Sequence, residues 1–253
     1  WDHQVAPNAP RATRLRMAKV PVEIGIHLWS LQPLAEAMAG YARFLSNDEV
    51  ARADRFVYPK HRIQFVATRG RLREIMGSLT GIKPEEVKFE YGPQGKPSLI
   101  FGPQFNLSHS GGVACLAVHD EIPLGVDIEA FREVESGVSQ RFFSATEYTT
   151  LMAMPIGDQV SGFFRCWTRK EAVIKALGGG LSIPLNAFDV TLEAKQPPLM
   201  TRLDQTYGEV SNWTLGHMTL GPTLMGAIAA KTFGGPIELR LDSNPDNIPF
   251  ESA

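Results

Sequence analysis

Residues 43–49 read RFLSNDE, and residues 141–147 repeat this stretch as RFFSATE. Both contain Ser-x-x-Glu, the capping box in which two side chains satisfy the first free N–H groups of a helix. Further identities occur at the same offset: Phe65 with Phe163, Arg71 with Arg169, Leu79 with Leu177 and Gly81 with Gly179. The eight identities over residues 43–81 predict a chain built from two similar halves. The alternative is a chance similarity between two capped amphipathic helices.

Each half is predicted to have an α+β fold, in which a long helix packs on a small antiparallel sheet. In the first half, residues 61–77 place apolar side chains at helical spacing, and Gly77 is a plausible helix stop. The helix of the second half is expected over residues 163–179. Strands are expected at residues 87–91, 105–108, 113–119, 124–129, 186–194, 212–220 and 225–233.

The chain divides into four predicted segments. A flexible arm rich in Pro, Ala and Arg covers residues 1–21, and the first α+β half covers residues 22–123, beginning with a strand near Val22. The second half covers residues 124–235. A polar C-terminal tail covers residues 236–253, and residues 241–253 are expected to be poorly ordered.

The composition excludes several classes of protein. Of 253 residues, 43% are hydrophobic and 21% charged, which is typical of a globular protein, and no apolar run approaches the roughly 18 residues that span a bilayer. The charged N-terminal segment is unlike a signal peptide, so a cytoplasmic location without a membrane partner is expected. The net charge of −2 gives no overall positive field of the kind that attracts nucleic acid. Cys115 and Cys166 lack the spacing of a disulfide framework or a zinc site.

Two carboxylates stand close together in GVDIE, residues 125–129. Because side chains alternate along a strand, Asp127 and Glu129 point to the same face. Such charges repel each other unless a positive group lies between them, and a hard divalent cation with oxygen ligands, above all Mg²⁺, fits this position. A sheet edge with solvated carboxylates is the alternative.

A third carboxylate comes from WTRKEAVIKALGGG, residues 167–180, where Glu171 and Lys175 share one helical face. An exposed ion pair is one interpretation of that spacing. Trp167 and the apolar residues 172–174 instead favour a closely packed helix. If Glu171 meets the strand pair, three acids form a Mg²⁺ site that leaves positions for water and substrate phosphates.

Several groups are candidates for binding phosphate. NLSHSGG, residues 106–112, offers Ser108, His109 and Ser110 at a strand end before two glycines, and Lys96 lies beside a Gly-Pro turn. The first long helix carries a stripe of arginines at positions 62, 69 and 73. The simpler interpretations are a hairpin turn, a surface lysine and a solvated helix face.

In chain order, FNLSHSGG, GVDIE, RFFSATEY and WTRKEAVIKALGGGLSIPL resemble the 4′-phosphopantetheinyl transferases, specifically the monomeric two-half type that activates surfactin synthetase and related carrier proteins. The resemblance runs from about Val22 to Phe233 and agrees with the internal repeat. It implies a monomeric pseudo-dimer with its active site at the junction of the halves. It also implies coenzyme A as co-substrate, Mg²⁺ as cofactor and an apo acyl or peptidyl carrier protein as partner.

The resemblance assigns roles to residues of this chain. The Mg²⁺ ligands are Asp127, Glu129 and Glu171, and Glu171 is the more necessary because position 128, polar in some relatives, is the apolar Ile128 here. Lys175 faces the diphosphate. The other residues implied for coenzyme A are Lys96, Ser108 and His109 at the phosphates, and Arg52, Arg62 and Arg69 at the 3′-phosphate. The register of those three arginines is ambiguous, because Glu49 stands near a place where some relatives carry lysine.

The implied reaction transfers the 4′-phosphopantetheine arm of coenzyme A to a serine of the carrier protein. The serine attacks the phosphorus that bears pantetheine, and adenosine 3′,5′-bisphosphate leaves. Glu171 is the expected general base, directly or through a water held by the metal, and Lys175 neutralises the leaving phosphate. Two alternatives are a Mg²⁺-dependent nucleotide diphosphate phosphohydrolase and a non-catalytic coenzyme A binding module.

Overall fold

The computed structural model describes residues 20–242 and 251–252. Its helices are α1 (Ala35–Phe44), α2 (Asn47–Ala53), α3 (Pro59–Thr80), α4 (Val138–Phe142), α5 (Ala145–Ala153) and α6 (Ile156–Leu177). Its strands are β1 (Val22–Ser30), β2 (Phe89–Tyr91), β3 (Pro97–Leu99), β4 (Gln104–Ser110), β5 (Val113–His119), β6 (Leu124–Ala130), β7 (Phe188–Val190), β8 (Met200–Leu203), β9 (Thr214–Thr219), β10 (Leu224–Ala230), β11 (Ile237–Leu241) and β12 (Glu251–Ser252).

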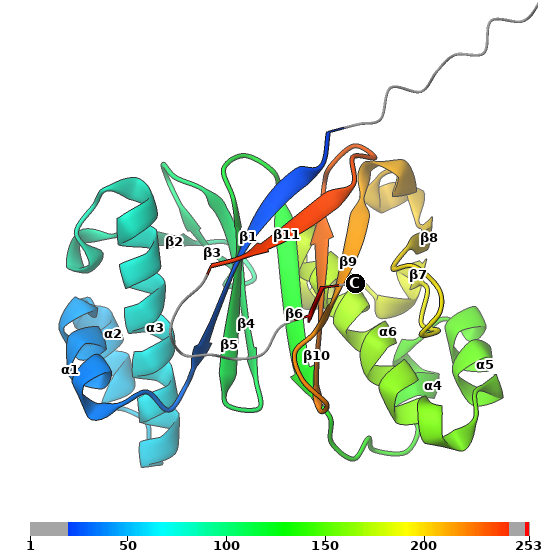
Figure 1. Cartoon of the computed structure of the whole chain (residues 1–253), viewed down its shortest axis with the longest axis horizontal. Coiled ribbons are helices and arrows are strands. Elements are labelled where there is room, and N and C mark those ends of the chain that lie inside the picture. The colour runs from blue at the N-terminus through cyan, green and yellow to red at the C-terminus, as the bar shows by residue number, and fades with distance from the viewer. Residues whose placement is uncertain (1–19, 243–250, 253) are drawn as a thin grey trace, which may run out of the picture.

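Two four-stranded sheets form the middle of the molecule, and helices cover the outer face of each (Figure 1). The first sheet has the order β11-β1-β5-β4 and packs against α3, and the second has the order β12-β9-β10-β6 and packs against α6. The paired strands are antiparallel except for β1 and β11, which are parallel. The predicted α+β architecture of two similar halves is confirmed.

The capping boxes begin equivalent helices in the two halves. Ser46 and Glu49 open α2, and Ser144 and Glu147 open α5. The long helices α3 and α6 both have 22 residues and both end at a glycine in the left-handed region, with φ of 72° at Gly81 and 74° at position 178. The two long helices therefore correspond to each other at a sequence offset that is one residue shorter than the offset between the two capping boxes.

The predicted helix stop at Gly77 is wrong, because α3 continues to Thr80. A Cβ atom at Gly77 would lie 2.7 Å from the carbonyl oxygen of Ile82. Glycine is therefore needed at this position to let the chain fold back against the helix. Close backbone approach explains the residue, and the helix ends one turn later at Gly81.

Alternation along β6 places its two kinds of side chain on opposite faces. Val126 and Ile128 lie in the apolar core between the two sheets, and Asp127 lies on the face that meets α6. A Cβ atom at Gly125 would lie only 2.1 Å from the carbonyl oxygen of Ala172. The backbone of α6 therefore lies directly against the backbone of β6, which holds the polar residues of the helix over the strand.

Each capping-box glutamate also binds a buried cation of the long helix. Glu49 accepts hydrogen bonds from Nε of Arg69 and Nε of Arg73, both at 2.6 Å, and Glu147 Oε1 lies 2.8 Å from Lys170 Nζ. Interpreting Arg69 and Arg73 as part of a solvated stripe is wrong, because their side chains are only 10% and 4% exposed. A buried guanidinium without a partner is costly, and Glu49 supplies a carboxylate oxygen for each of these two.

The end of the chain contributes strands to both sheets. Residues 237–241 of the predicted tail form β11 beside β1, and β12 pairs with β9. Residues 1–19, 243–250 and 253, for which an arm and a poorly ordered end were expected, lie outside the described residues. Within the residues that the structure describes, no helix is long and apolar enough to cross a membrane.

Candidate active site

The edge strands of the two sheets, β4 and β6, meet through side chains. Three backbone N–H groups of β6 donate to polar side chains at alternate positions of β4: Val126 to Asn106 Oδ1 (2.8 Å), Ile128 to Ser108 Oγ (3.3 Å) and Ala130 to Ser110 Oγ (3.0 Å). Short side chains of β4 in the first half thus accept hydrogen bonds from backbone N–H groups that would otherwise be free at the edge of the second sheet. This seam, formed by residues 106, 108, 110 and 124–130, carries the carboxylates.

Asp127 is buried in the seam with two partners. Ser108 Oγ donates to its Oδ1 at 2.9 Å, and Lys175 Nζ of α6 donates to the same oxygen at 2.6 Å. Its Oδ2 has no hydrogen-bond partner among the described residues. Burial raises the pKa of Asp127, and the ammonium of Lys175 opposes that shift. Because Asp127 is only 5% exposed, the alternative of a solvated sheet edge is wrong for this residue.

Glu129 is the next residue of β6 on the same face as Asp127, and it also has hydrogen-bond partners. Ser110 Oγ donates to its Oε2 at 2.9 Å, and Arg132 Nη1 donates to the same oxygen at 2.7 Å. Nη2 of Arg132 lies 3.5 Å from the other oxygen, Oε1. Both carboxylates of β6 therefore have one hydroxyl partner from β4 and one cation from the second half.

Glu171 faces these carboxylates from α6 without an ion pair within the described residues. Burial raises the pKa of Glu171, the charge of Asp127 adds to the shift, and Lys175 opposes it. The alternative of an exposed ion pair between Glu171 and Lys175 is wrong, because Lys175 turns to Asp127 instead. A carboxylate with a raised pKa is suited to accept a proton near neutral pH.

The three acids fit a hard divalent cation in their chemistry. All three offer carboxylate oxygens, which are the ligands that such a cation prefers. Oδ2 of Asp127 is buried and accepts no hydrogen bond, and no cation in the described part of the chain forms an ion pair with Glu171. Across residues 20–242 and 251–252, however, no three His, Cys, Asp or Glu side chains are already arranged to hold a metal ion. Lys175 and Arg132 occupy the places beside the β6 carboxylates.

Lys96 reaches this site from the loop before β3. Its Nζ donates to the carbonyl oxygen of Lys175 at 2.7 Å and to that of Leu124 at 3.1 Å. Burial lowers the pKa of Lys96 to about 8, and the charge of Lys175 contributes to the shift. The simple interpretation as a surface lysine is wrong, since the side chain bridges the C-terminal turn of α6 and the start of β6.

The other predicted phosphate ligands lie in different surroundings. Ser108 is buried, whereas His109 is exposed on the next position of β4, and the two-residue turn that follows is a hairpin with φ of 60° at Gly111. Arg52 is exposed above the ring of Phe65, and Arg62 is exposed and paired with Asp54 at 3.2 Å. Among the described residues, neither arginine bonds to a residue of the seam.

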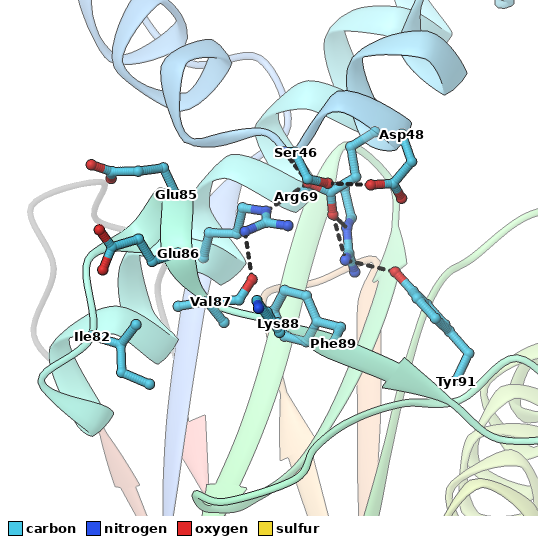
Figure 2. Close-up of a pocket in the computed structure, with 12 residues that line it drawn as sticks. Ser46, Asp48, Arg69, Ile82, Glu85, Glu86, Val87, Lys88, Phe89 and Tyr91 are labelled. Carbon is cyan, nitrogen blue, oxygen red and sulfur yellow. Dashed lines mark hydrogen bonds and ion pairs between the residues drawn. The ribbon is translucent and has the colours of Figure 1, made fainter.

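A cavity of about 700 Å³ lies in the first half (Figure 2), and no residue of the seam lines it. Its charged lining residues are Asp48, Glu49, Glu85, Glu86, Arg69, Arg73 and Lys88. Arg69, a predicted 3′-phosphate ligand, donates to Glu49 at 2.6 Å. It also donates to the hydroxyl of Tyr91 at 2.8 Å (Figure 2). Glu49 is shared between Arg69 and Arg73, so both guanidiniums are already held by a carboxylate.

A second cavity, of about 450 Å³, borders Glu171. Glu171 and Lys175 line it on one side. Its apolar lining residues are Phe142, Ile174, Ile183, Pro184 and Leu185. A substrate group that enters this cavity reaches the unpaired carboxylate of α6 from a largely apolar side.

Sequence reasoning missed two residues that shape the seam, and it named Ser110 only as a possible phosphate group. Asn106 belongs with Ser108 and Ser110 to an Asn-x-Ser-x-Ser alternation on β4, and this period of two was a readable signal for polar side chains on one face. Arg132 follows β6 in an irregular segment, and nothing in the sequence indicates that its guanidinium turns back to Glu129.

Two family models match the chain. The model described as "4'-phosphopantetheinyl transferase, N-terminal" matches residues 29–121, and the model described as "4'-phosphopantetheinyl transferase superfamily" matches residues 123–223. The boundary between the matches falls in the turn before β6.

Characterised proteins are similar over most of the chain. The 4'-phosphopantetheinyl transferase HetI of Nostoc sp. (strain PCC 7120) is 37% identical over 83% of this chain and 89% of its own length. The 4'-phosphopantetheinyl transferase Sfp of Bacillus subtilis (strain 168) is 31% identical over 60% of this chain and 68% of its own. A crystal structure of Thermotoga maritima holo-[acyl-carrier-protein] synthase covers 44% of this chain and 63% of its own, with a TM-score of 0.31 and 18% identity.

Proposed function

The chain belongs to the 4′-phosphopantetheinyl transferase superfamily, whose reaction moves phosphopantetheine from coenzyme A to carrier proteins, and we propose that the β4–β6 seam is where it does so. The observation that carries this proposal is the convergence of Asp127, Glu129, Glu171 and Lys175, which come from two separate segments. Lys175 and Lys96 supply positive charge for a diphosphate, and the acids supply oxygen ligands for a metal.

In this proposal Asp127, Glu129 and Glu171 hold a magnesium ion. What such an ion supplies is charge neutralisation at the diphosphate of coenzyme A. Lys175 leaves Asp127 and donates to the diphosphate oxygens, where negative charge grows as adenosine 3′,5′-bisphosphate departs. Lys96, Ser108 and His109 bind phosphates of the same molecule, and the exposed Arg52 and Arg62 are more accessible to the 3′-phosphate than the buried Arg69.

The nucleophile is a serine hydroxyl of the apo carrier protein. Its oxygen forms a bond to the phosphorus that bears pantetheine, and the bond from this phosphorus to the bridging diphosphate oxygen breaks. Glu171 takes the proton of the hydroxyl, because its raised pKa brings proton affinity closer to neutral pH. The 450 Å³ cavity beside Glu171 gives the partner an approach to this carboxylate.

Mass spectrometry of apo carrier proteins tests the proposal directly. Fatty acid, polyketide and nonribosomal peptide carriers are incubated with the protein, coenzyme A and Mg²⁺, and at least one is expected to gain the phosphopantetheine arm on serine. A carrier with that serine changed to alanine is the matched control and stays unmodified. If adenosine bisphosphate is released without any carrier and no carrier gains mass, the phosphohydrolase alternative replaces the transferase.

The low pKa of Lys96 predicts a pH dependence of coenzyme A binding. Below about pH 8 Lys96 is protonated and attracts phosphate, and as the pH rises through this value the charge and its contribution are lost. Affinity is therefore expected to fall about three- to tenfold between pH 7 and pH 9.5, as for one charge-assisted hydrogen bond. Calorimetry with S-methyl coenzyme A, whose blocked thiol does not titrate, measures this change.

The variant Lys96→Gln provides the comparison for that pH profile. It is expected to bind more weakly at pH 7 and to show no fall over the same range. A fall of equal size in this variant would mean that another group titrates, and Lys96 would then have no part in phosphate binding.

A further inference from the structure

Both β6 carboxylates of the seam already have a cation as partner. Lys175 binds Asp127 and Arg132 binds Glu129, whereas Glu171 has no ion pair within the described residues. Each cation binds one β6 carboxylate, so a divalent ion that enters the site meets ligands that are already neutralised. The two cations differ in how easily they leave, because the side chain of Lys175 is 27% exposed and that of Arg132 is 58% exposed.

Arg132 spans both oxygens of Glu129. Nη1 donates to Oε2 at 2.7 Å, an oxygen that also accepts from Ser110, and Nη2 approaches Oε1 to 3.5 Å. The guanidinium also lies 5.4 Å from the ring centroid of the buried Phe164. A divalent ion bound to either oxygen of Glu129 would lie close to this guanidinium, and the two positive charges repel.

We propose that Arg132 takes the place of the divalent cation at Glu129 in the metal-free enzyme and competes with that cation for the carboxylate. This inference rests on the proposed metal role of the seam acids. Arg132 keeps Glu129 oriented along β6, and when the ion binds, the guanidinium is released to water at little cost because it is already more than half exposed. Lys175 can leave Asp127 only for another anion, such as a substrate phosphate, since it is far less exposed.

The proposed competition predicts the direction in which metal affinity changes when Arg132 is replaced. Removing the positive charge of Arg132 removes both the competitor and its repulsion of the incoming ion, so metal affinity rises. A residue that merely shaped the loop, or that supported Glu129 as a ligand, would lower metal affinity when changed. Metal affinity in the absence of coenzyme A therefore separates the two roles without reference to turnover.

The test measures Mn²⁺ binding to the whole protein, without coenzyme A, from the electron paramagnetic resonance signal of the free ion. Arg132→Gln is expected to bind Mn²⁺ about three- to tenfold more tightly than the unchanged protein, the range of one partly exposed ion pair. Arg132→Lys keeps the charge and is expected to stay within about twofold. Arg240→Gln removes the same charge from a pair with Glu23 in the first half and is expected to change nothing.

Each outcome has one meaning. Equal or weaker Mn²⁺ affinity in Arg132→Gln overturns the competition while leaving the metal site intact. Tighter binding in both Arg132→Gln and Arg240→Gln overturns it as well, because net charge alone then explains the gain. If none of the four proteins binds Mn²⁺, the proposed metal role of the seam acids has failed, and the competition with it.

Discussion

Glu171→Gln is expected to lower the rate of phosphopantetheine transfer by at least a hundredfold while coenzyme A still binds. The substitution keeps the shape of the side chain and removes both its charge and its capacity to accept a proton, and loss of a general base typically costs a factor of about 10² to 10⁴. Lys175, Lys96 and the β4 hydroxyls remain in place, so the dissociation constant is expected to rise by less than about tenfold. Carrier mass spectrometry gives the rate, and calorimetry gives the affinity.

The first half offers a matched control for this variant. Glu74 is the sixteenth residue of the 22-residue α3, as Glu171 is of the 22-residue α6, but it pairs with Arg71 instead of facing β6. Glu74→Gln therefore removes the same charge at the equivalent position and is expected to leave transfer within about twofold. Full activity in Glu171→Gln would remove Glu171 from both of its roles, as base and as metal ligand.

The predictable parts of this molecule are those that depend on local sequence. The Ser-x-x-Glu patterns begin α2 and α5 because the capping box is complete within four residues. The alternation in GVDIE placed Asp127 and Glu129 on one face of β6 for a similar reason, since the period of a strand is two. The Glu171 and Lys175 spacing likewise identified one face of α6 before its partner strand was known.

The parts that escaped prediction depend on contacts between distant segments. Gly77 read as a helix stop because a glycine near the end of an apolar pattern usually is one, and only the returning chain at Ile82 shows why it lies inside α3. The helical spacing of Arg69 favours a solvated stripe, yet the side chain is buried against a partner, Glu49, that lies 20 residues earlier. Arg132 is invisible as a site residue because an irregular segment has no period that fixes where a side chain points.

Gly125→Ala is expected to destabilise the protein by about 3 kcal/mol or more and to abolish transfer together with it. The added Cβ would lie 2.1 Å from the carbonyl oxygen of Ala172 and 2.4 Å from the backbone nitrogen of Ala176, and both belong to the rigid backbone of α6. The helix must therefore move away from β6. That movement separates Glu171 and Lys175 from Asp127, so the same methyl group damages both the core and the site.

Gly40→Ala distinguishes this clash from a general effect of replacing glycine. Gly40 lies within α1, and a Cβ atom there would have nothing within 4 Å, so alanine is expected to raise the free energy of unfolding by about 0.5–1 kcal/mol through its better helix propensity. Urea denaturation followed by circular dichroism measures both variants. An unchanged denaturation midpoint in Gly125→Ala would mean that α6 can shift without cost. The close contact with β6 would then not be what holds Glu171 at the carboxylates.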